Sequence, residues 1–218
     1  MTEKNIIKLV VGPIATNCWI YPIDEKSAAI IDPGDEADVI ISALKKSNLS
    51  PQFILLTHGH FDHIAAVPYL AEAFPNEMQI AIHQLDSQYL GPDAYKAHSL
   101  SIKAAMGGSE FIDAFWHDLP SADCFLEEGG TIGPFTVLHL PGHTQGSVAF
   151  WDEKYGLLFS GDTLFKGGYG RTDLPGGNEQ QLLASLNRLF IMDENIKVYP
   201  GHGNTTTIGK EKQNRNFK

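Results

Sequence analysis

The stretch that decides the fold reads Phe53-Ile54-Leu55-Leu56-Thr57-His58-Gly59-His60-Phe61-Asp62-His63. Its first four residues predict a short buried strand, because they form an apolar run that ends at a glycine-bearing turn. Residues two apart in an extended chain point the same way, so His58 and His60 are expected to bind one metal ion together. The chain then turns into a helix, which can aim Asp62 and His63 toward a second metal ion. Imidazole and carboxylate groups are common ligands of zinc and iron.

The same arrangement, an apolar run followed by a turn and a metal-capable side chain, recurs three times further along the chain. Residues 137–140 lead to His143, residues 156–159 lead to Asp162, and residues 197–199 lead to His202. Each of these side chains, taken alone, is more typical of an ordinary turn or helix cap. Because glycine-bearing strand ends can present side chains at one edge of a sheet, the four segments are expected to converge on one site.

The rest of the sequence alternates short strands and helices, and predicts one domain over residues 1–218. Strands are expected at residues 6–11, 18–23, 28–32, 135–140, 147–151, 156–160 and 197–199. Helices are expected at residues 39–44, with Asp35 as the N-cap, and at residues 64–71 and 179–189. Residues 83–120 have the least regular pattern, and the polar residues after His202 are expected to form a short closing tail.

Bulk composition argues against several classes of protein. A chain of 218 residues with 43% hydrophobic content can bury a sizeable core. Its formal net charge of −10 opposes binding to nucleic acids and to anionic membrane surfaces. We expect no signal peptide and no transmembrane segment, and we expect Cys18 and Cys124 to be reduced thiols. These features predict a cytoplasmic protein.

Together, these motifs resemble those of the metallo-β-lactamase-fold hydrolases, and within them the small single-domain branch of the glyoxalase II-like (hydroxyacylglutathione hydrolase-like) group. The segments that carry the resemblance are Asn17-Cys18, Asp32-Pro33-Gly34, Thr57–His63, Pro141–Thr144, Gly161–Phe165 and Tyr199–His202. The resemblance implies an α/β fold, a four-layer αβ/βα sandwich in which two mixed sheets pack face to face with helices outside. It also implies the metal ligands, which are His58, His60 and His143 for the first ion, Asp62, His63 and His202 for the second, and Asp162 as the bridge.

The implied activity is hydrolysis with two divalent metal ions, for which zinc is expected and iron or manganese remain open. Two such ions about 3.5–4 Å apart lower the pKa of a shared water toward ~7 and polarise a substrate carbonyl. Asp62 is expected to orient the nucleophile. The motifs contain no obvious general acid, and a thiol of pKa ~8.5 can leave without one. This favours a small-molecule thioester as the substrate.

The loop at residues 168–173 leaves two questions open. Arg171 matches a basic position near the substrate in the family, so it is predicted to bind a substrate carboxylate. An equally good interpretation is a clasp between Arg171 and Asp173 within the loop. The same Gly-Arg-Thr-Asp run occurs in the related persulfide dioxygenases, which hold one iron ion with two histidines and one aspartate. A mononuclear iron oxidoreductase is therefore the alternative function, and a metal-stabilised binding domain without catalysis is a weaker one.

The remaining histidines receive simpler interpretations. His139 is expected to make a hydrogen bond near the site, and His83, His98 and His117 are expected to lie at the surface. The aromatic residues between 83 and 120 could cover the metal site or form a homodimer contact, and plain core packing is slightly favoured over both.

Overall fold

The computed structural model describes residues 4–75 and 77–214 of the chain. The strands are β1 Ile7–Val11, β2 Thr16–Pro22, β3 Ser27–Ile31, β4 Ser50–Leu55, β5 Gln79–His83, β6 Cys124–Leu126, β7 Thr131–Ile132, β8 Phe135–His139, β9 Val148–Asp152, β10 Leu157–Gly161, β11 Lys197–Pro200 and β12 Thr206–Thr207. The helices are α1 Ala37–Lys46, α2 Phe61–Ile64, α3 Val67–Ala73, the 3₁₀ helix η1 Gln84–Tyr89, α4 Ala94–Met106, α5 Glu110–Phe115, α6 Glu179–Phe190 and α7 Ile208–Lys212.

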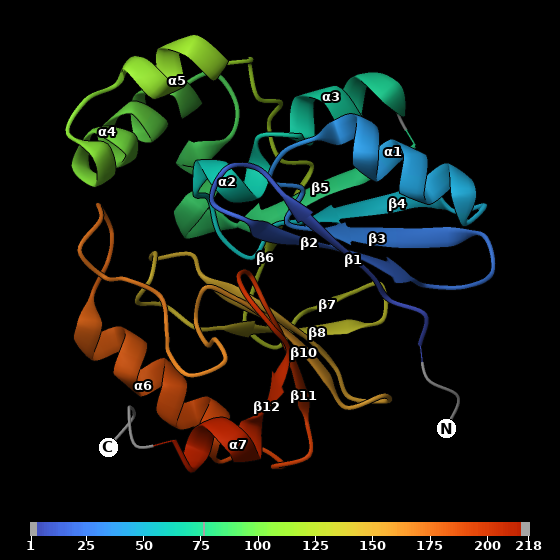
Figure 1. Cartoon of the computed structure of the whole chain (residues 1–218), viewed down its shortest axis with the longest axis vertical. Coiled ribbons are helices and arrows are strands. Elements are labelled where there is room, and N and C mark those ends of the chain that lie inside the picture. The colour runs from blue at the N-terminus through green and yellow to red at the C-terminus, as the bar shows by residue number, and fades with distance from the viewer. Residues whose placement is uncertain (1–3, 76, 215–218) are drawn as a thin grey trace.

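Two six-stranded sheets pack face to face, and helices lie on their outer faces (Figure 1). The first sheet has the order β1-β2-β3-β4-β5-β6 and the second has the order β12-β11-β10-β9-β8-β7. Both sheets are mixed, since β2 and β3 are antiparallel whereas β3 and β4 are parallel, and β10 is antiparallel to β9 but parallel to β11. The predicted four-layer sandwich of two mixed sheets is therefore confirmed.

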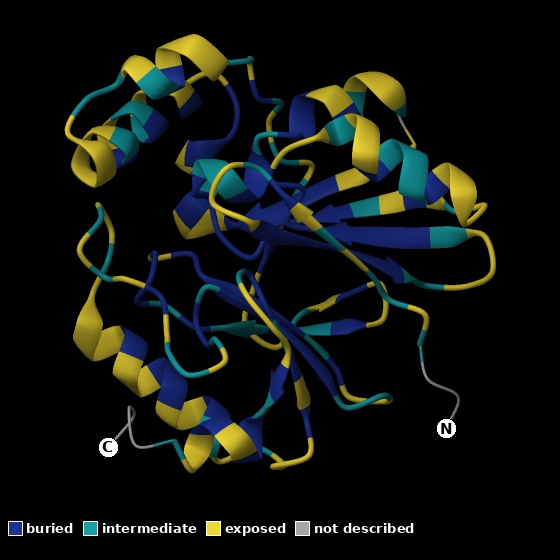
Figure 2. Cartoon of the chain, in the orientation of Figure 1, coloured by how far each residue is buried: buried dark blue, intermediate teal, exposed yellow. Residues whose placement is uncertain are grey.

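Alternation along the first sheet divides its apolar residues between two layers. Ala28 and Ile30 of β3 face outward and join a cluster with Ile40 and Leu44 of α1, whereas Ile31 faces the other sheet. Successive strand side chains point to opposite faces, so a strand covered on both sides must be apolar at every position. This explains why the central strands stand out as continuous apolar runs, and why they are the most buried ribbons in Figure 2.

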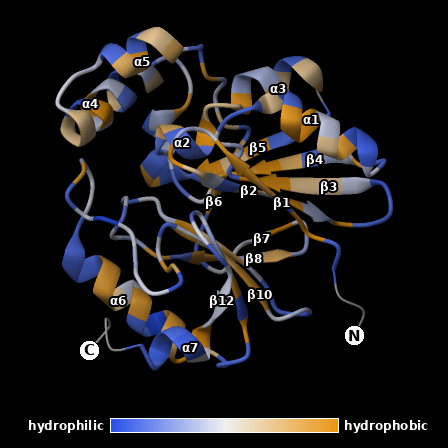
Figure 3. Cartoon of the chain, viewed as in Figure 1, coloured by the Kyte–Doolittle hydropathy of each residue, from blue (hydrophilic) through white to orange (hydrophobic). Residues whose placement is uncertain are grey.

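The second sheet is built in the same way. Its inner face contributes Phe135 and Phe159 to the layer between the sheets, where both rings pack against Tyr21 at centroid distances of 4.7 and 5.9 Å. Its outer face is covered by α6 through residues at helical spacing, including Leu182 and Leu186. Hydrophobic colour follows the strands of both sheets, and the exposed side of α6 is mostly hydrophilic (Figure 3).

Three local expectations were wrong. The helix that begins after the histidine motif is divided into α2 and α3, so residues 64–71 do not form one helix. The N-cap of α1 is Glu36, in a left-handed conformation with φ 52°, and Asp35 only accepts a hydrogen bond from the Glu36 amide. Residues 83–120 are also more regular than predicted, because they contain η1, α4 and α5.

The polar tail after His202 closes the fold with β12 and α7.

Cys18 and Cys124 are both free thiols on strands of the first sheet. Within the described residues, no helix combines the length and the apolar character that crossing a membrane requires.

Candidate metal centre

The seven side chains predicted from the sequence lie together where strands of the two sheets end. His58 and His60 follow β4, and α2 carries Asp62 and His63. The other three come from the second sheet, in the order His143 after β8, Asp162 after β10 and His202 after β11. The predicted convergence of four strand ends is therefore observed.

One group is formed by three histidines. The nitrogen atoms that His58, His60 and His143 can offer to a metal lie within 4.8 Å of one another. Nδ1 of His60 is 2.9 Å from Nε2 of His143, and the three ring centroids are 4.6 to 4.9 Å apart. These rings are close enough to bind a single ion.

A second group contains Asp62, His63 and His202, whose ligand atoms also lie within 4.8 Å of one another. Oδ2 of Asp62 is 3.2 Å from Nε2 of His63 and 3.3 Å from Nε2 of His202. The helix α2 places Asp62 and His63 on this side of the site, as expected from the turn that follows His60.

Asp162 lies between the two groups. Its Oδ1 is 3.4 Å from Nε2 of His63, and its Oδ2 is 3.7 Å from Nε2 of His143 and 3.6 Å from Nε2 of His202. The carboxylate needs a glycine beside it, because a Cβ on Gly201 would be 2.1 Å from Oδ1. The Asp162 carboxylate thus contacts both groups.

Several atoms of the site are buried without a hydrogen-bond partner. They include Nε2 of His58 and Nε2 of His60, whereas Nε2 of His63 faces only the carboxylates of Asp62 and Asp162, at 3.2 and 3.4 Å. A buried polar atom without a partner costs about 1–3 kcal/mol, so this cluster requires an explanation. A set of imidazole nitrogens and carboxylate oxygens suits zinc, iron or manganese. The residues present therefore fit divalent metal ions.

A surrounding layer of hydrogen bonds fixes the ring orientations. Buried Asp32 accepts hydrogen bonds from Nδ1 of His63 at 3.0 Å and from the amide and hydroxyl of Thr57 at 2.8 and 2.7 Å. Nδ1 of His143 donates to the carbonyl of Arg171 at 2.7 Å. With Nδ1 engaged, both rings turn Nε2 toward the site. Asp32 also lies close to His58. Because its two oxygens already accept these hydrogen bonds, its role is to position the metal ligands and not to bind a metal ion itself.

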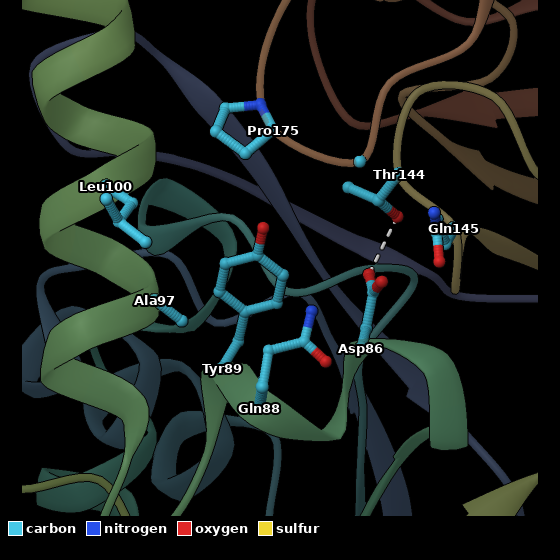
Figure 4. Close-up of a pocket in the computed structure, with 9 residues that line it drawn as sticks. Asp86, Gln88, Tyr89, Ala97, Leu100, Thr144, Gln145 and Pro175 are labelled. Carbon is cyan, nitrogen blue, oxygen red and sulfur yellow. Dashed lines mark hydrogen bonds between the residues drawn. The ribbon is translucent and has the colours of Figure 1, made fainter.

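Asp86 links the two loops that carry the histidine group. Its carboxylate accepts hydrogen bonds from the Gly59 amide at 3.0 Å, the Gly146 amide at 2.8 Å and the Thr144 hydroxyl at 2.7 Å. Figure 4 shows the bond to Thr144. Gly59 lies between His58 and His60, whereas Thr144 follows His143. Asp86 is not predicted from the sequence, because nothing in its local pattern marks it.

Burial and charge set the protonation states of the ion-free site. Burial lowers the pKa of His58 well below its ordinary value and that of His60 to about 3, so both rings are neutral at pH 7. Burial has the same effect on His63, but Asp62 and Asp162 outweigh it and raise the His63 pKa well above its ordinary value. Burial would raise the pKa of both carboxyl groups, yet His63 lowers it. Because metals bind neutral imidazoles and ionised carboxylates, His63 must release its proton when a metal ion binds, whereas the other groups named here are already in the metal-binding form.

Arg171 and Asp173 form the clasp that was one of the two interpretations of their loop. Nε and Nη2 of Arg171 donate to the two carboxylate oxygens of Asp173, each at 2.7 Å. Both side chains are about half exposed or more, and Arg171 also lines the cavity above the metal centre.

The other histidines follow the predictions only in part. His139 makes the expected hydrogen bond, from Nε2 to the Gln145 carbonyl at 2.9 Å, and His117 is substantially exposed. The predictions for His83 and His98 were wrong. His83 is largely buried and stacks on His139 at a centroid distance of 4.1 Å. His98, on α4, is fully buried among the rings of Phe61, Tyr89 and Trp116, and it donates from Nε2 to the Tyr89 carbonyl at 2.9 Å.

A profile described as the metallo-beta-lactamase superfamily matches residues 11–202. The chain belongs to this superfamily. Hydroxyacylglutathione hydrolase GloC of Haemophilus influenzae is 37% identical to it over 218 residues, which cover 98% of this chain and 97% of the relative. The probable metallo-hydrolase YqgX of Bacillus subtilis is 35% identical, with coverage of 96% and 95%. Hydrolysis with bound metal is therefore the activity that the family supports.

Two solved structures are similar over almost their whole length. The B3 metallo-beta-lactamase BLEG-1 has a TM-score of 0.82 and 37% identity, covering 98% of this chain and 99% of that one. TTHA1623 in a di-iron-bound form has a TM-score of 0.80 and 37% identity, covering 97% and 100%.

Proposed function

We propose that this protein is a two-metal hydrolase of thioesters. His58, His60 and His143 would hold one ion, Asp62, His63 and His202 the other, and Asp162 would bridge them. The observation that carries the proposal is the position of the Asp162 carboxylate between the two ligand groups, within 3.4 to 3.7 Å of His63, His143 and His202. The similar structure of TTHA1623 in a di-iron-bound form supports two metal positions in this chain. We propose zinc as the metal, with iron or manganese as alternatives.

Bound at this site, a pair of divalent ions supplies the electrostatic environment that activates water and polarises a carbonyl. The chain's own contribution begins with Asp62. Thr16 donates a hydrogen bond to its Oδ2 at 2.9 Å, which fixes the carboxylate at the floor of the cavity. A fixed carboxylate at this place can accept a hydrogen bond from a water molecule and so orient it toward a substrate carbonyl.

The cavity favours a leaving group that departs without a proton. His98 is the lining histidine outside the metal-ligand set, and burial lowers its pKa to about 4. Its Nε2 is also bound to the Tyr89 carbonyl, so its ring is a poor proton donor at pH 7. A thiolate leaves readily at this pH, whereas an alkoxide or amine does not. The name of the GloC relative agrees with a thioester, and the acidic charge supports a small-molecule substrate.

Metal analysis combined with activity assays tests this proposal. Protein isolated without chelator should contain close to two metal ions per chain, and it should release thiol from S-D-lactoylglutathione or from simpler thioesters. Because residues 170–173 have the Gly-Arg-Thr-Asp sequence of the persulfide dioxygenases, the same protein is also assayed for that activity. We would conclude that the protein is a dioxygenase and not a hydrolase if it contained one iron ion per chain, consumed oxygen with a persulfide and released no thiol from thioesters.

A further inference from the structure

The segment Asn17-Cys18 carries part of the family resemblance, but neither of its residues is a candidate metal ligand. Asn17 lies on β2 in the first sheet and is fully buried. His202 lies in the turn that follows β11, a strand of the second sheet (Figure 1). Contacts between this asparagine and that turn connect the two sheets beside the metal centre.

The side chain of Asn17 spans the turn that carries His202. Its Nδ2 donates hydrogen bonds to the carbonyl of Pro200 at 2.9 Å and to the carbonyl of Gly203 at 3.0 Å. Its backbone amide donates to the carbonyl of Gly201 at 2.7 Å. Carbonyl groups on both sides of His202 are therefore held by one residue of the opposite sheet.

Two more side chains of the first sheet bind the same carbonyl groups. Nε1 of Trp19 donates to the Pro200 carbonyl at 3.2 Å, and Nζ of Lys8 donates to the Gly203 carbonyl at 2.6 Å. The Lys8 ammonium group also lies 5.5 Å from the centroid of the Trp19 ring. Because Asn17 binds both carbonyl groups, it joins these contacts into one network.

The direction of the His202 ring depends on this backbone. Nδ1 of His63 and Nδ1 of His143 are each bound to an acceptor, whereas no hydrogen bond to Nδ1 of His202 is found among the described residues. Nε2 of His202 nevertheless lies 3.3 Å from Oδ2 of Asp62, in the site. An acceptor at the second ring nitrogen is the usual means of orienting a histidine ligand, so here the turn itself has to be fixed.

The amide oxygen of Asn17 indicates which property of this residue matters. Oδ1 is buried and has no hydrogen-bond partner in the part of the chain that the structure describes. A buried acceptor without a partner opposes folding, so neither packing nor this oxygen explains an asparagine here. The two donors of its NH₂ group are the atoms in use. The preceding residue, Thr16, donates to Oδ2 of Asp62 at 2.9 Å, so consecutive residues of β2 hold Asp62 and the turn of His202.

We infer that Asn17 is a positioning residue for the second metal ion, because its NH₂ group holds the His202 turn against the first sheet. The inference rests on the proposed function, which supplies the two metal positions. Asn17 acts through the backbone of the turn and is not itself a ligand. Loss of its two donors should therefore weaken binding of the second ion and leave the first ion, at the three-histidine group, in place.

The variant Asn17→Leu tests the inference, since leucine is close to asparagine in size and has no polar atoms in its side chain. Zinc binding to the metal-free protein is measured in competition with a chromophoric chelator, and the step that is lost in His202→Ala identifies the second ion. We expect this step to weaken about 10- to 100-fold in Asn17→Leu, while the other step stays unchanged. Equal weakening of both steps, or an unchanged second step, would overturn the inference.

Hydrogen exchange gives a readout that needs no metal ion. The Gly201 amide donates to the Gly161 carbonyl at 2.8 Å, and the Gly142 amide, in the turn of His143, donates to the Thr144 carbonyl at 2.9 Å. In metal-free Asn17→Leu the Gly201 amide should exchange faster, whereas the Gly142 amide should keep its wild-type rate. Equal acceleration of both amides would indicate general destabilisation and overturn the inference. If the wild type bound only one ion, the two-metal hydrolase would be refuted, whereas selective exchange at Gly201 would still support the positioning role.

A second variant decides the question if Asn17→Leu does not fold. Lys8→Met changes an exposed side chain and removes one donor to the Gly203 carbonyl, so it should weaken the second step in the same direction but by less. Lys46→Met is the matched control, because Lys46 is exposed on α1 and its replacement removes the same charge. A second step equal to that of the control would then overturn the inference.

Discussion

Replacing Asp86 with asparagine should loosen the metal centre without altering any candidate metal ligand. The Asp86 carboxylate holds the Gly59 amide from one loop, and the Gly146 amide and the Thr144 hydroxyl from the other. Asparagine has nearly the same shape but offers one oxygen acceptor instead of two. Its NH₂ group would face one of the two backbone N–H groups. Because both groups are donors, that hydrogen bond would be lost.

The size of the effect follows from these contacts. A buried donor left without an acceptor costs about 1–3 kcal/mol, and a hydrogen bond to a charged group contributes about 1.5–3 kcal/mol. We therefore expect Asp86→Asn to lower the free energy of unfolding of the metal-free protein by about 3 kcal/mol. Because the histidine group would be less well ordered, its metal affinity should fall about 10- to 100-fold.

Urea unfolding followed by circular dichroism measures the stability, and competition with a chelator measures the metal affinity. Asp173→Asn is the control, since it removes a charge from the exposed clasp with Arg171, where an ion pair contributes little to stability. If Asp86→Asn matched this control in both measurements, the three hydrogen bonds would have no role in organising the site.

Three further predictions concern single side chains. Asp162→Asn should lower the metal content at both positions and abolish hydrolysis, whereas His202→Ala should lower it mainly at the position of the second ion. Equal metal content in the two variants, measured by atomic emission, would contradict the proposed bridging role of Asp162. Arg171→Ala should reduce kcat/KM equally for carboxylate-bearing and neutral thioesters, because its guanidinium is paired in the clasp; a larger loss for the charged substrate would instead make Arg171 a substrate-binding residue. Burial lowers the His98 pKa from 6.5 to about 4, so the folded state binds fewer protons than the unfolded state between these values. The free energy of unfolding should therefore fall by up to about 3 kcal/mol as the pH drops from 6.5 to 4, and His98→Gln should show a shallower decline in urea titrations at several pH values.

Residues 83–120, which are predicted least well from the sequence, contain α4, and this helix lines the cavity above the metal centre. Helix α4 buries Ala94, His98 and Ser101, which are small or polar residues, so its buried face carries no apolar stripe. Helix prediction depends on such a stripe, so without one the sequence predicts an irregular segment over residues 83–120. The prediction of a surface position for His98 was wrong for the same reason, since the ring is covered by Phe61, Tyr89 and Trp116, which are distant from it in the sequence.

The sequence by itself predicted many of the strands and the convergence of seven candidate ligands, and the family resemblance of its motifs implied the two-sheet architecture. The strands and ligands could be predicted because apolar runs, glycine-bearing turns and the His58–His63 motif act over a few residues, where spacing fixes direction. The tertiary structure alone decided which carboxylates position the ligands, since Asp32 and Asp86 act on residues 25 to 60 positions away. It also decided the shape and charge of the cavity, because those depend on how α4 and the loop before α6 pack over the centre, and no local pattern records the contacts between distant segments.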